Sequence, residues 1–281
     1  MELVCKYKVI LVGQHDNLFI KRLSNYFDIT ILNTFDTSRD AVSFISKQDR
    51  FVFFLVFLGM DVEVAETEFF IRQIQEYQKV VDIVKISCNE YFQLDVSFFD
   101  LQLFGFLYYP YSEHEISLIS KLYFEKFDFY KLLVSDNKDI IKECKLVAEH
   151  EKRYSVLIVD DEKDNCRNYQ AFLKDSFDVF IAFDVETAFD IFQKNSIDIV
   201  LLDIGLPVRS GLDVLPDLFA MNPSIYIIMV TAFTEIDTID YCFSQGAFSY
   251  LTKPFLKTTF KYLVERAVQA KQIRHYLTVY H

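Results

Sequence analysis

The sequence predicts an α/β protein made of two tandem units, each built on a parallel β-sheet. Long apolar runs alternate with stretches of helical periodicity, which is typical of strands buried on both faces and joined by helices. The layout occurs twice within 281 residues, a length that suits two domains of about 100–150 residues each. The stretch Ser196–Asp213 is central, because its apolar run ends abruptly at Asp203 and a loop with Pro207 and Gly211 follows.

The first half shows four apolar runs and two helical patterns. The runs predict strands at 7–13, 51–58, 80–86 and 103–108, and the helical patterns extend to about Phe27 and over about 112–129. Residues 132–152 are polar and helix-compatible, with Ser135 or Asp136 as a possible cap. We therefore expect one domain at 1–131, a helical linker at 132–152 and a second domain at 153–281.

The second half predicts five β–α units. Strands are expected at 154–159, 179–182, 199–202, 225–230 and 248–251, and helices to about Asp175, over 186–194, 212–221 and 234–245, and from Lys257 onward.

Composition narrows the classes of function. The chain is 52% hydrophobic and 25% charged, with a net charge of −12, and this acidic balance argues against direct contact with DNA or RNA. The five cysteines form no C-x-x-C pair, which predicts reduced thiols and no zinc site. The most apolar segment, Phe51–Met60, is too short to cross a bilayer, and the N-terminus lacks a secretion signal. We expect a cytoplasmic protein without a membrane partner.

Polar residues follow the predicted strands of the second half. Asp160 and Asp161 end its first strand, Asp203 its third, Thr231 its fourth and Lys253 its fifth. Because the carboxyl ends of parallel strands meet at one edge of a sheet, we expect these side chains in one crevice. Three neighbouring carboxylates repel one another unless a hard divalent cation such as Mg²⁺ binds them. An ammonium and a hydroxyl can contact phosphate oxygens, and an aspartate can accept a phosphoryl group.

At these motifs the sequence resembles the receiver domain of two-component response regulators. The resemblance covers about 153–274 and rests on four ordered motifs: VLIVDDE (156–162), IVLLDIGLPVRSGLDVL (199–215), IIMVTAF (227–233) and GAFSYLTKPF (246–255). It implies a flavodoxin-like (βα)5 fold with strand order 2-1-3-4-5. By the same resemblance Asp203 is the phosphoacceptor, and Asp160, Asp161 and the backbone carbonyl of Gly205 join it in binding Mg²⁺. Thr231 and Tyr250 are the switch pair, and Lys253 contacts the phosphoryl group before a cis Pro254.

The resemblance also implies partners. A phosphohistidine on a histidine kinase or phosphotransfer protein would donate to Asp203, and the domain would catalyse its own phosphorylation and dephosphorylation without a separate enzyme domain. Output would pass through protein–protein contacts on the face of the fourth helix, fifth strand and fifth helix. We expect a phosphorylation-sensitive homodimer through that face, which carries the following charged residues: Glu235, Asp237, Asp240, Lys257, Lys261, Arg266, Lys271 and Arg274.

The first half is interpreted as a degenerate copy, a pseudo-receiver. A shift of 147 aligns Gly13-Gln14 with Asp160-Asp161 and Val56 with Asp203. A shift of 144 aligns Ser87 with Thr231, Phe106 with Tyr250, and Tyr109-Pro110-Tyr111 with Lys253-Pro254-Phe255. A three-residue insertion between Val56 and Ser87 would explain the change. Without carboxylates, this half should bind no Mg²⁺ and accept no phosphate.

Two other functions are open. An aspartate-nucleophile phosphohydrolase would share the Asp, Lys, Thr and Mg²⁺, but its D-x-D motif is absent here. Alternatively, the chain is the regulatory part of a larger protein whose output domain is a cyclase, a kinase or a DNA-binding module.

Overall fold

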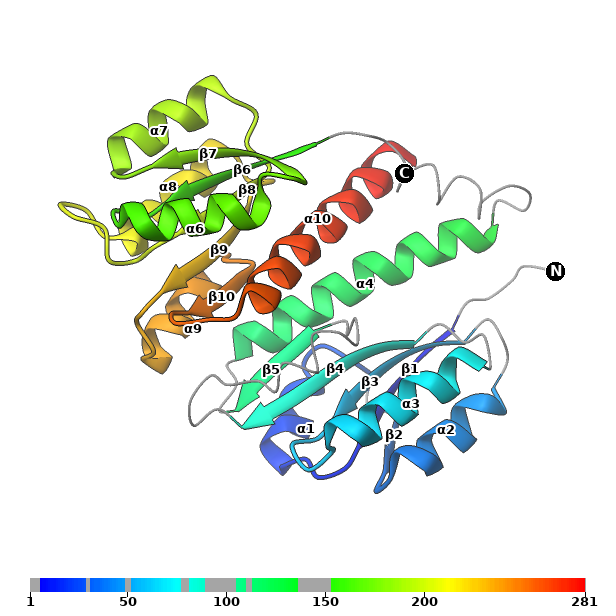
Figure 1. The fold of residues 1–281 in the computed structure, drawn as a ribbon. Helices are drawn as coiled ribbons and strands as arrows, with labels where there is room; N and C mark the ends of the chain where they lie inside the picture. Colours follow the sequence, from blue (N-terminus) through cyan, green and yellow to red (C-terminus); the bar gives the residue numbers. More distant parts are fainter. Residues whose placement is uncertain are drawn as a thin grey trace. The chain divides into compact units, whose positions relative to one another are not determined.

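The computed structural model describes residues 6–28, 31–48, 52–76, 81–88, 105–109, 113–135 and 153–280. The chain separates into two compact units that divide near Ile141. We call them unit 1, which holds β1–β5, and unit 2, which holds β6–β10 (Figure 1).

Unit 1 is a five-stranded parallel sheet in the order β2-β1-β3-β4-β5. Its elements are β1 (Lys6–Val12), α1 (Asn17–Leu23), β2 (Leu32–Phe35), α2 (Ser38–Ser46), β3 (Val52–Leu58), α3 (Val64–Glu76), β4 (Val81–Cys88), β5 (Gly105–Tyr109) and α4 (Glu113–Ser135).

Unit 2 repeats this sheet in the order β10-β9-β8-β6-β7. Its elements are β6 (Tyr154–Val159), α6 (Lys163–Leu173), β7 (Phe177–Ala182), α7 (Val185–Lys194), β8 (Ile199–Leu202), α8 (Gly211–Met221), β9 (Tyr226–Thr231), α9 (Ile236–Ser244), β10 (Ser249–Thr252) and α10 (Lys257–Tyr280).

Both sheets confirm the predicted fold class and strand order. Numbered from the first strand of each unit, each order is 2-1-3-4-5. The apolar runs form the central strands because both of their faces are covered: every residue of β3, β8 and β9 is buried. The carboxyl ends of the strands therefore meet at one edge of each sheet, and the reversal of order next to the first strand opens a crevice there.

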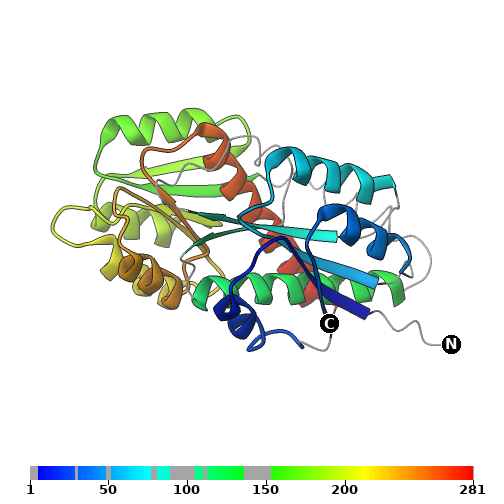
Figure 2. The same ribbon diagram turned by 90° about the horizontal axis from the view of Figure 1, so that it is seen from below.

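Helices cover the two faces of each sheet. In unit 2 the rings of Tyr169 and Phe172 on α6 pack against Phe260 on α10, so these two helices share one face. Residues of α7, α8 and α9 form a single apolar cluster with the strands on the other face. In unit 1, α2 and α3 lie on one side of the sheet, and α1 and α4 lie on the other (Figure 2).

Unit 1 differs from the prediction in several features, and α2 and α3 were not among its two predicted helical patterns. The short strand β2 was not among the four predicted runs, because its sequence LNTF is only half apolar. The closing helix α4 extends through Ser135, so the first four residues of the predicted linker belong to it. The rest of that linker, 136–152, lies outside the described residues.

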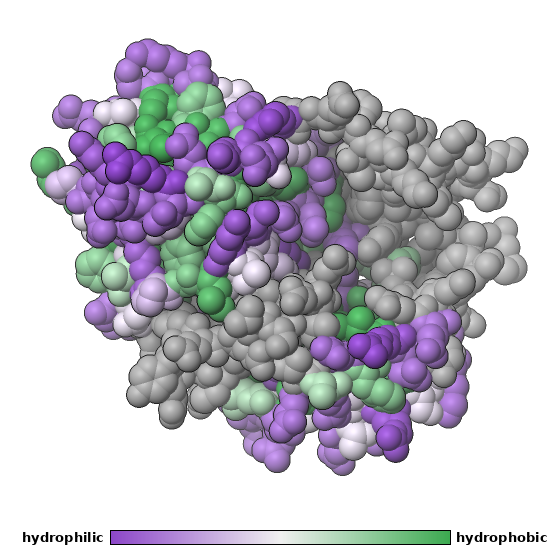
Figure 3. Space-filling model, in the orientation of Figure 1, coloured by the Kyte–Doolittle hydropathy of each residue, from purple (hydrophilic) through white to green (hydrophobic). Residues whose placement is uncertain are grey.

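On the face seen in Figure 3, the described residues present hydrophilic surface with smaller hydrophobic areas between. None of the helices in the described ranges is long and apolar enough to span a bilayer.

Candidate functional site

Three carboxylates and one ammonium meet at the carboxyl edge of the unit 2 sheet. Asp160 and Asp161 follow β6, Asp203 follows β8, and Lys253 follows β10. One oxygen from each of the three aspartates lies within 4.8 Å of the others. Lys253 Nζ donates to Asp160 Oδ2 at 2.7 Å and to Asp203 Oδ2 at 2.6 Å. The structure therefore brings these four predicted residues together.

Lys253 bridges two carboxylates that are themselves buried: Asp160 is 2% exposed and Asp203 is 7% exposed. Burial alone would lower the pKa of Lys253, but the hydrogen bonds that it donates to Asp160 and Asp203, together with the charges of these aspartates, outweigh burial, and the net shift of the pKa is upward. The ammonium thus stays charged and balances part of the local negative charge. The Lys253–Pro254 peptide bond is cis, as predicted.

The chain around Asp160 fixes the direction of its carboxylate. The backbone N–H of Glu162 donates to Asp160 Oδ1 at 2.9 Å, and Asn165 Nδ2 lies 3.4 Å from Oδ2. Cys166 Sγ donates to the Asp160 carbonyl at 3.2 Å, and burial followed by the nearby Asp160 charge raises the pKa of this thiol to about 12. Sequence reasoning did not single out Asn165 or Cys166, whose only signal was their place in the turn after Asp160-Asp161.

Asp203 is positioned by the backbone on both sides of it. Its N–H donates to the Val159 carbonyl at 2.9 Å, and its Oδ1 accepts from Gly205 N at 3.1 Å. A Cβ at Gly211 would overlap the carbonyl oxygen of Asp203, so α8 can begin at this position only with glycine. A Cβ at Gly205 would be 3.8 Å from Asp203 Oδ1, which is ordinary contact, so space does not require that glycine.

The predicted switch residues lie on the two neighbouring strands. Thr231 ends β9, is fully buried, and its Oγ1 accepts from Phe233 N at 3.4 Å. Tyr250 on β10 is also buried, and its hydroxyl donates to the Phe233 carbonyl at 3.0 Å. Burial, with smaller contributions from neighbouring groups that include Asp203, raises the pKa of Tyr250. The backbone of Phe233 therefore connects the side chains of Thr231 and Tyr250.

Exposed apolar side chains surround this edge of unit 2. Phe183, Val208, Phe233 and Leu256 lie in the loops that follow β7, β8, β9 and β10, and their exposed fractions range from 39% for Phe183 to 110% for Val208. Val208 also has a φ of 68°, which is rare for a β-branched residue. Such a rim suits contact with another protein surface.

The donor set fits a hard divalent cation. Asp160 and Asp203 are buried while Asp161 is exposed, so the cluster opens to solvent on one side. Oxygen ligands of this kind suit Mg²⁺, which keeps several waters and takes only a few carboxylates. The carbonyl of Gly205, the fourth predicted ligand, belongs to the exposed loop directly after Asp203.

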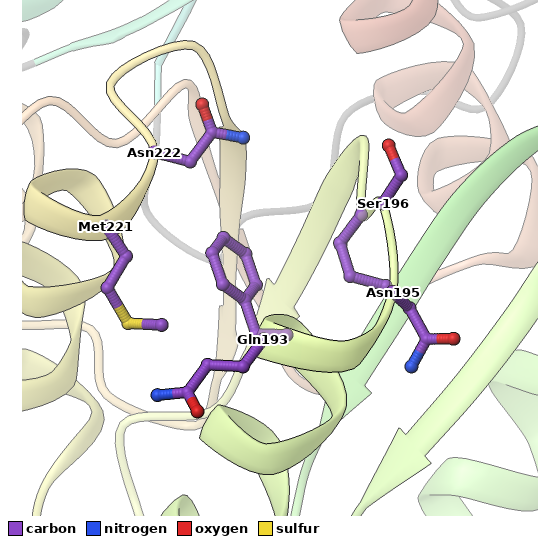
Figure 4. Close-up of a pocket in the computed structure, with 7 residues that line it drawn as sticks. Gln193, Asn195, Ser196, Met221 and Asn222 are labelled. Atoms are coloured by element: carbon purple, nitrogen blue, oxygen red, sulfur yellow. The ribbon is translucent and has the colours of Figure 1, made fainter.

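A separate cavity of about 450 Å³ lies between the ends of α7 and α8, lined by Asn195, Ser196 and Asn222 among others (Figure 4). Its amides already serve the fold: Asn195 Nδ2 donates to the Ile191 carbonyl, and Asn222 Oδ1 accepts from Ser224 N. It contains none of the predicted site residues.

Unit 1 can be compared with unit 2 by matching backbone hydrogen bonds. Gly13 N donates to Phe35 O as Asp160 N does to Ala182 O, so Gly13 takes the place of Asp160, as predicted. Gly59 N donates to Val12 O as Asp203 N does to Val159 O. The counterpart of Asp203 is therefore Gly59.

The predicted counterpart, Val56, is wrong by three residues. Val56 lies in the middle of β3, paired with Ile10 and Ile83. The interval from Phe35 to Leu58 is three residues longer than that from Ala182 to Leu202, so the insertion precedes Gly59 and does not lie between Val56 and Ser87. The uninterrupted apolar run of β3 gave no sign of where the strand ends.

The other predicted correspondences in unit 1 agree with the strand register. Lys85 pairs with Leu58 and Phe106 as Met229 pairs with Leu202 and Tyr250. It follows that Ser87 corresponds to Thr231, Phe106 to Tyr250 and Tyr109 to Lys253. Pro110 and Tyr111 lie outside the described residues.

Unit 2 is similar in sequence to a known domain family and to known regulatory proteins. Residues 156–265 match the family described as the response regulator receiver domain. The regulatory protein AtoC of Escherichia coli is 35% identical over 126 residues, which are 43% of this chain and 27% of AtoC. The transcriptional regulatory protein ZraR of Salmonella typhimurium is 31% identical over 103 residues, 36% of this chain and 23% of ZraR.

Among solved structures, the chemotaxis protein CheY4 of Vibrio cholerae is 25% identical and covers 41% of this chain and 99% of its own, with a TM-score of 0.40. This chain spans only about a quarter of the length of AtoC and ZraR.

Proposed function

We propose that this chain, whose residues 156–265 belong to the response regulator receiver domain family, accepts a phosphoryl group on Asp203 from a phosphohistidine of a histidine kinase or phosphotransfer protein. The observation that carries the proposal is the Lys253 ammonium, held between the carboxylates of Asp160 and Asp203. A buried aspartate with a cation beside it and an open edge towards solvent suits phosphoryl transfer.

Each site residue of unit 2 has a separate role in the proposed phosphoryl transfer. Asp203 Oδ2 supplies the attacking oxygen, and Lys253, already within 2.6 Å of it, can follow the negative charge onto the new phosphoryl oxygens. Asp160, Asp161 and the Gly205 carbonyl would hold Mg²⁺ together with Asp203. When bound, this cation neutralises charge on the phosphoryl group, since phosphoryl transfer depends mainly on positioning and electrostatics.

The switch would act through the Phe233 peptide. A phosphoryl oxygen on Asp203 offers Thr231 a stronger acceptor, and a movement of Thr231 removes the hydroxyl to which Phe233 N donates. The carbonyl of Phe233, in the next peptide group, accepts a hydrogen bond from the Tyr250 hydroxyl, so a movement of the Phe233 backbone also shifts Tyr250 between two packings. The signal then passes to a downstream protein.

Homodimerisation through the α9–β10–α10 face is the weaker part of this proposal. Three of the five basic side chains expected there contact other parts of unit 2: Lys257 lies over the Phe172 ring, Lys271 pairs with Asp198 at 3.1 Å, and Arg274 lies over the Tyr226 ring. Sedimentation with and without beryllofluoride tests the idea, and a protein that shows no self-association after beryllofluoride treatment would exclude the dimer.

Unit 1 would have no part in phosphoryl transfer. Gly13 and Gly59 replace two of the three carboxylates, and Gln14 aligns with the third. Of the residues that the structure describes, only Asp160, Asp161 and Asp203 form a cluster that could hold a metal ion. We infer a pseudo-receiver that keeps the fold without the chemistry.

The test is labelling with a small radioactive acyl phosphate, with and without Mg²⁺. We expect label that depends on Mg²⁺, is lost in Asp203→Asn, and persists in Asp213→Asn, which removes an exposed carboxylate from the first turn of α8. Label without Mg²⁺, or label that survives in Asp203→Asn, would refute the proposal.

A second candidate is the regulatory part of a longer protein, because the chain spans about a quarter of the length of AtoC and ZraR. Isolation of the native protein and measurement of its mass would decide this. The phosphohydrolase alternative predicts steady release of phosphate from small phosphomonoesters, whereas a receiver would release none.

A further inference from the structure

We infer that the cleft of unit 1 is filled by the chain's own charged groups, Asp61 and Lys85, which replace the external ion and phosphoryl group of unit 2 and fix unit 1 in one state. This inference rests on the proposal that unit 1 is a receiver fold without phosphorylation.

Asp61 occupies the space that the missing carboxylates would need. It lies two residues after Gly59, at the place of Gly205 in unit 2, and its Oδ1 accepts from Gln14 N at 2.7 Å. A Cβ at Gly13 or at Gly59 would overlap Asp61 Oδ1. Gly13 also has a φ of 80°, which only glycine adopts easily. The Asp61 carboxylate thus lies close to both glycines, and at Gly59 the backbone carbonyl of Gln14 also leaves no room for a Cβ.

Lys85 brings a positive charge to the same edge. It is 2% exposed, donates to the Gly59 carbonyl, and also donates to the Ile86 carbonyl at 2.8 Å. Its counterpart in unit 2 is Met229, an ordinary core residue. A buried ammonium in place of a methionine costs free energy unless hydrogen bonds compensate it. Part of this compensation comes from the carbonyl of Gly59, the counterpart of the phosphoacceptor Asp203.

Three further observations support one connected cluster. Burial lowers the pKa of Lys85 to about 8, and the nearby Asp61 opposes that shift. Burial likewise lowers the pKa of His15, on which Asp61 and Lys85 both act. His15 Nε2 donates to the Val12 carbonyl at 3.1 Å, and its ring stacks on Phe19. At the edge that in unit 2 would take a cation, unit 1 thus holds ionisable groups from the loops after β1 and β3 and from β4, of which Lys85 is buried and Asp61 is exposed.

The test is residue-resolved hydrogen exchange on the full chain, with the amides of unit 2 as internal reference. Asp61→Gly and Lys85→Met install the unit 2 residues at these positions, and Asp61→Asn keeps an oxygen acceptor for Gln14 N. We expect Asp61→Gly to accelerate exchange at 13–16 and 59–63 by about tenfold, with a smaller change in Asp61→Asn. Lys85→Met should accelerate the same amides, and the double variant should fall short of the product of the two effects.

Unchanged exchange at 13–16 and 59–63 in Asp61→Gly would overturn the inference, as would effects that multiply fully in the double variant. If Asp61→Gly unfolds unit 1, as the core amides of β1 and β3 would reveal, Lys85→Met and its combination with Asp61→Asn decide by the same criterion. Phosphoryl labelling of Asp203→Asn is measured in parallel. Label in unit 1 would refute the proposal that this unit accepts no phosphoryl group, whatever the exchange rates show.

Discussion

In each unit a lysine with little exposed surface lies near the carboxyl edge of the sheet, and the two lysines, Lys253 and Lys85, have opposite environments. Lys253 in unit 2 lies between two carboxylates, and the pKa of its ammonium is raised. Lys85 in unit 1 is held by two backbone carbonyls, and burial lowers its pKa to about 8. One lysine comes from the loop after the fifth strand, and the other comes from the fourth strand itself.

The difference shows how one scaffold can hold a working site and a closed one. In unit 2 three carboxylates lie beside a single ammonium, that of Lys253. A further cation would therefore stabilise the site electrostatically. In unit 1 one carboxylate and one ammonium come from the chain itself, and two glycines leave room for them. The strand order is the same, so the loops and a few strand-end residues decide which unit can react.

The largest expected contrast is kinetic. Lys253→Met should slow phosphoryl labelling of Asp203 about 100-fold, because it removes the charge that follows the transferred group. Lys85→Met, the matched change in unit 1, should alter the labelling rate less than about twofold, since it touches no reacting atom. Initial rates of label incorporation measure both effects. Equal losses of labelling rate in the two variants would contradict the assignment of phosphoryl transfer to unit 2 alone.

A second contrast lies within unit 2, between two glycines near Asp203. Gly211→Ala should lower the free energy of unfolding by about 2–4 kcal/mol, because its Cβ would overlap the Asp203 carbonyl. Gly205→Ala should change it by less than about 0.5 kcal/mol, because that position has space for a Cβ. Urea titrations, followed by hydrogen exchange on peptides of unit 2, measure the free energy of unfolding of both variants. Similar costs at both glycines would mean that the overlap at Gly211 is relieved by the loop.

The pH dependence of unit 1 should reveal Lys85. Its pKa is lowered in the folded state, so the unfolded chain binds more protons between pH 8 and the ordinary lysine pKa of 10.5. The free energy of unfolding of unit 1 should therefore rise with pH through that window, by on the order of 2 kcal/mol.

Lys85→Met should abolish that rise. Pulsed hydrogen exchange, followed on peptides of unit 1 across a urea series, measures the free energy of unfolding of this unit. Repeating it at several pH values gives the difference in that free energy between the parent chain and the variant. A difference that stays constant from pH 7.5 to about 10.5 would show that the ammonium is not buried in this way.

The smallest expected effect concerns the switch side chain. Tyr250→Phe removes the hydrogen bond to the Phe233 carbonyl and should cost about 1 kcal/mol of unfolding free energy while labelling continues. Calorimetry gives the stability and labelling gives the activity. Loss of labelling in this variant would make Tyr250 part of the transfer chemistry.

Much of unit 2 could be predicted from its sequence because four of its five strands end at a marked polar residue. Asp160, Asp203, Thr231 and Lys253 stop the apolar runs sharply, so the register and the meeting of these side chains follow from the parallel sheet. The contacts of Asn165 and Gly211 could not be predicted, since they depend on how the loops fold back on Asp160 and Asp203.

Unit 1 was harder to predict because its strands lack such markers. The run VFFLVFL is apolar at every position, so the alignment could slip by three residues and place Val56 where Gly59 belongs. Lys85 lies inside an otherwise apolar strand, and nothing in its spacing to Gly59 predicts that the two residues meet. A short polar strand such as β2 shows too little periodicity to be recognised.

The central claim is that one chain holds two copies of a scaffold and one working site. The most direct test is the number of phosphoryl groups per chain, measured by intact mass spectrometry after saturating treatment with an acyl phosphate and Mg²⁺. We expect one phosphoryl group, on Asp203, and none in Asp203→Asn. A second phosphoryl group on the parent chain, or one that persists in Asp203→Asn, would contradict it.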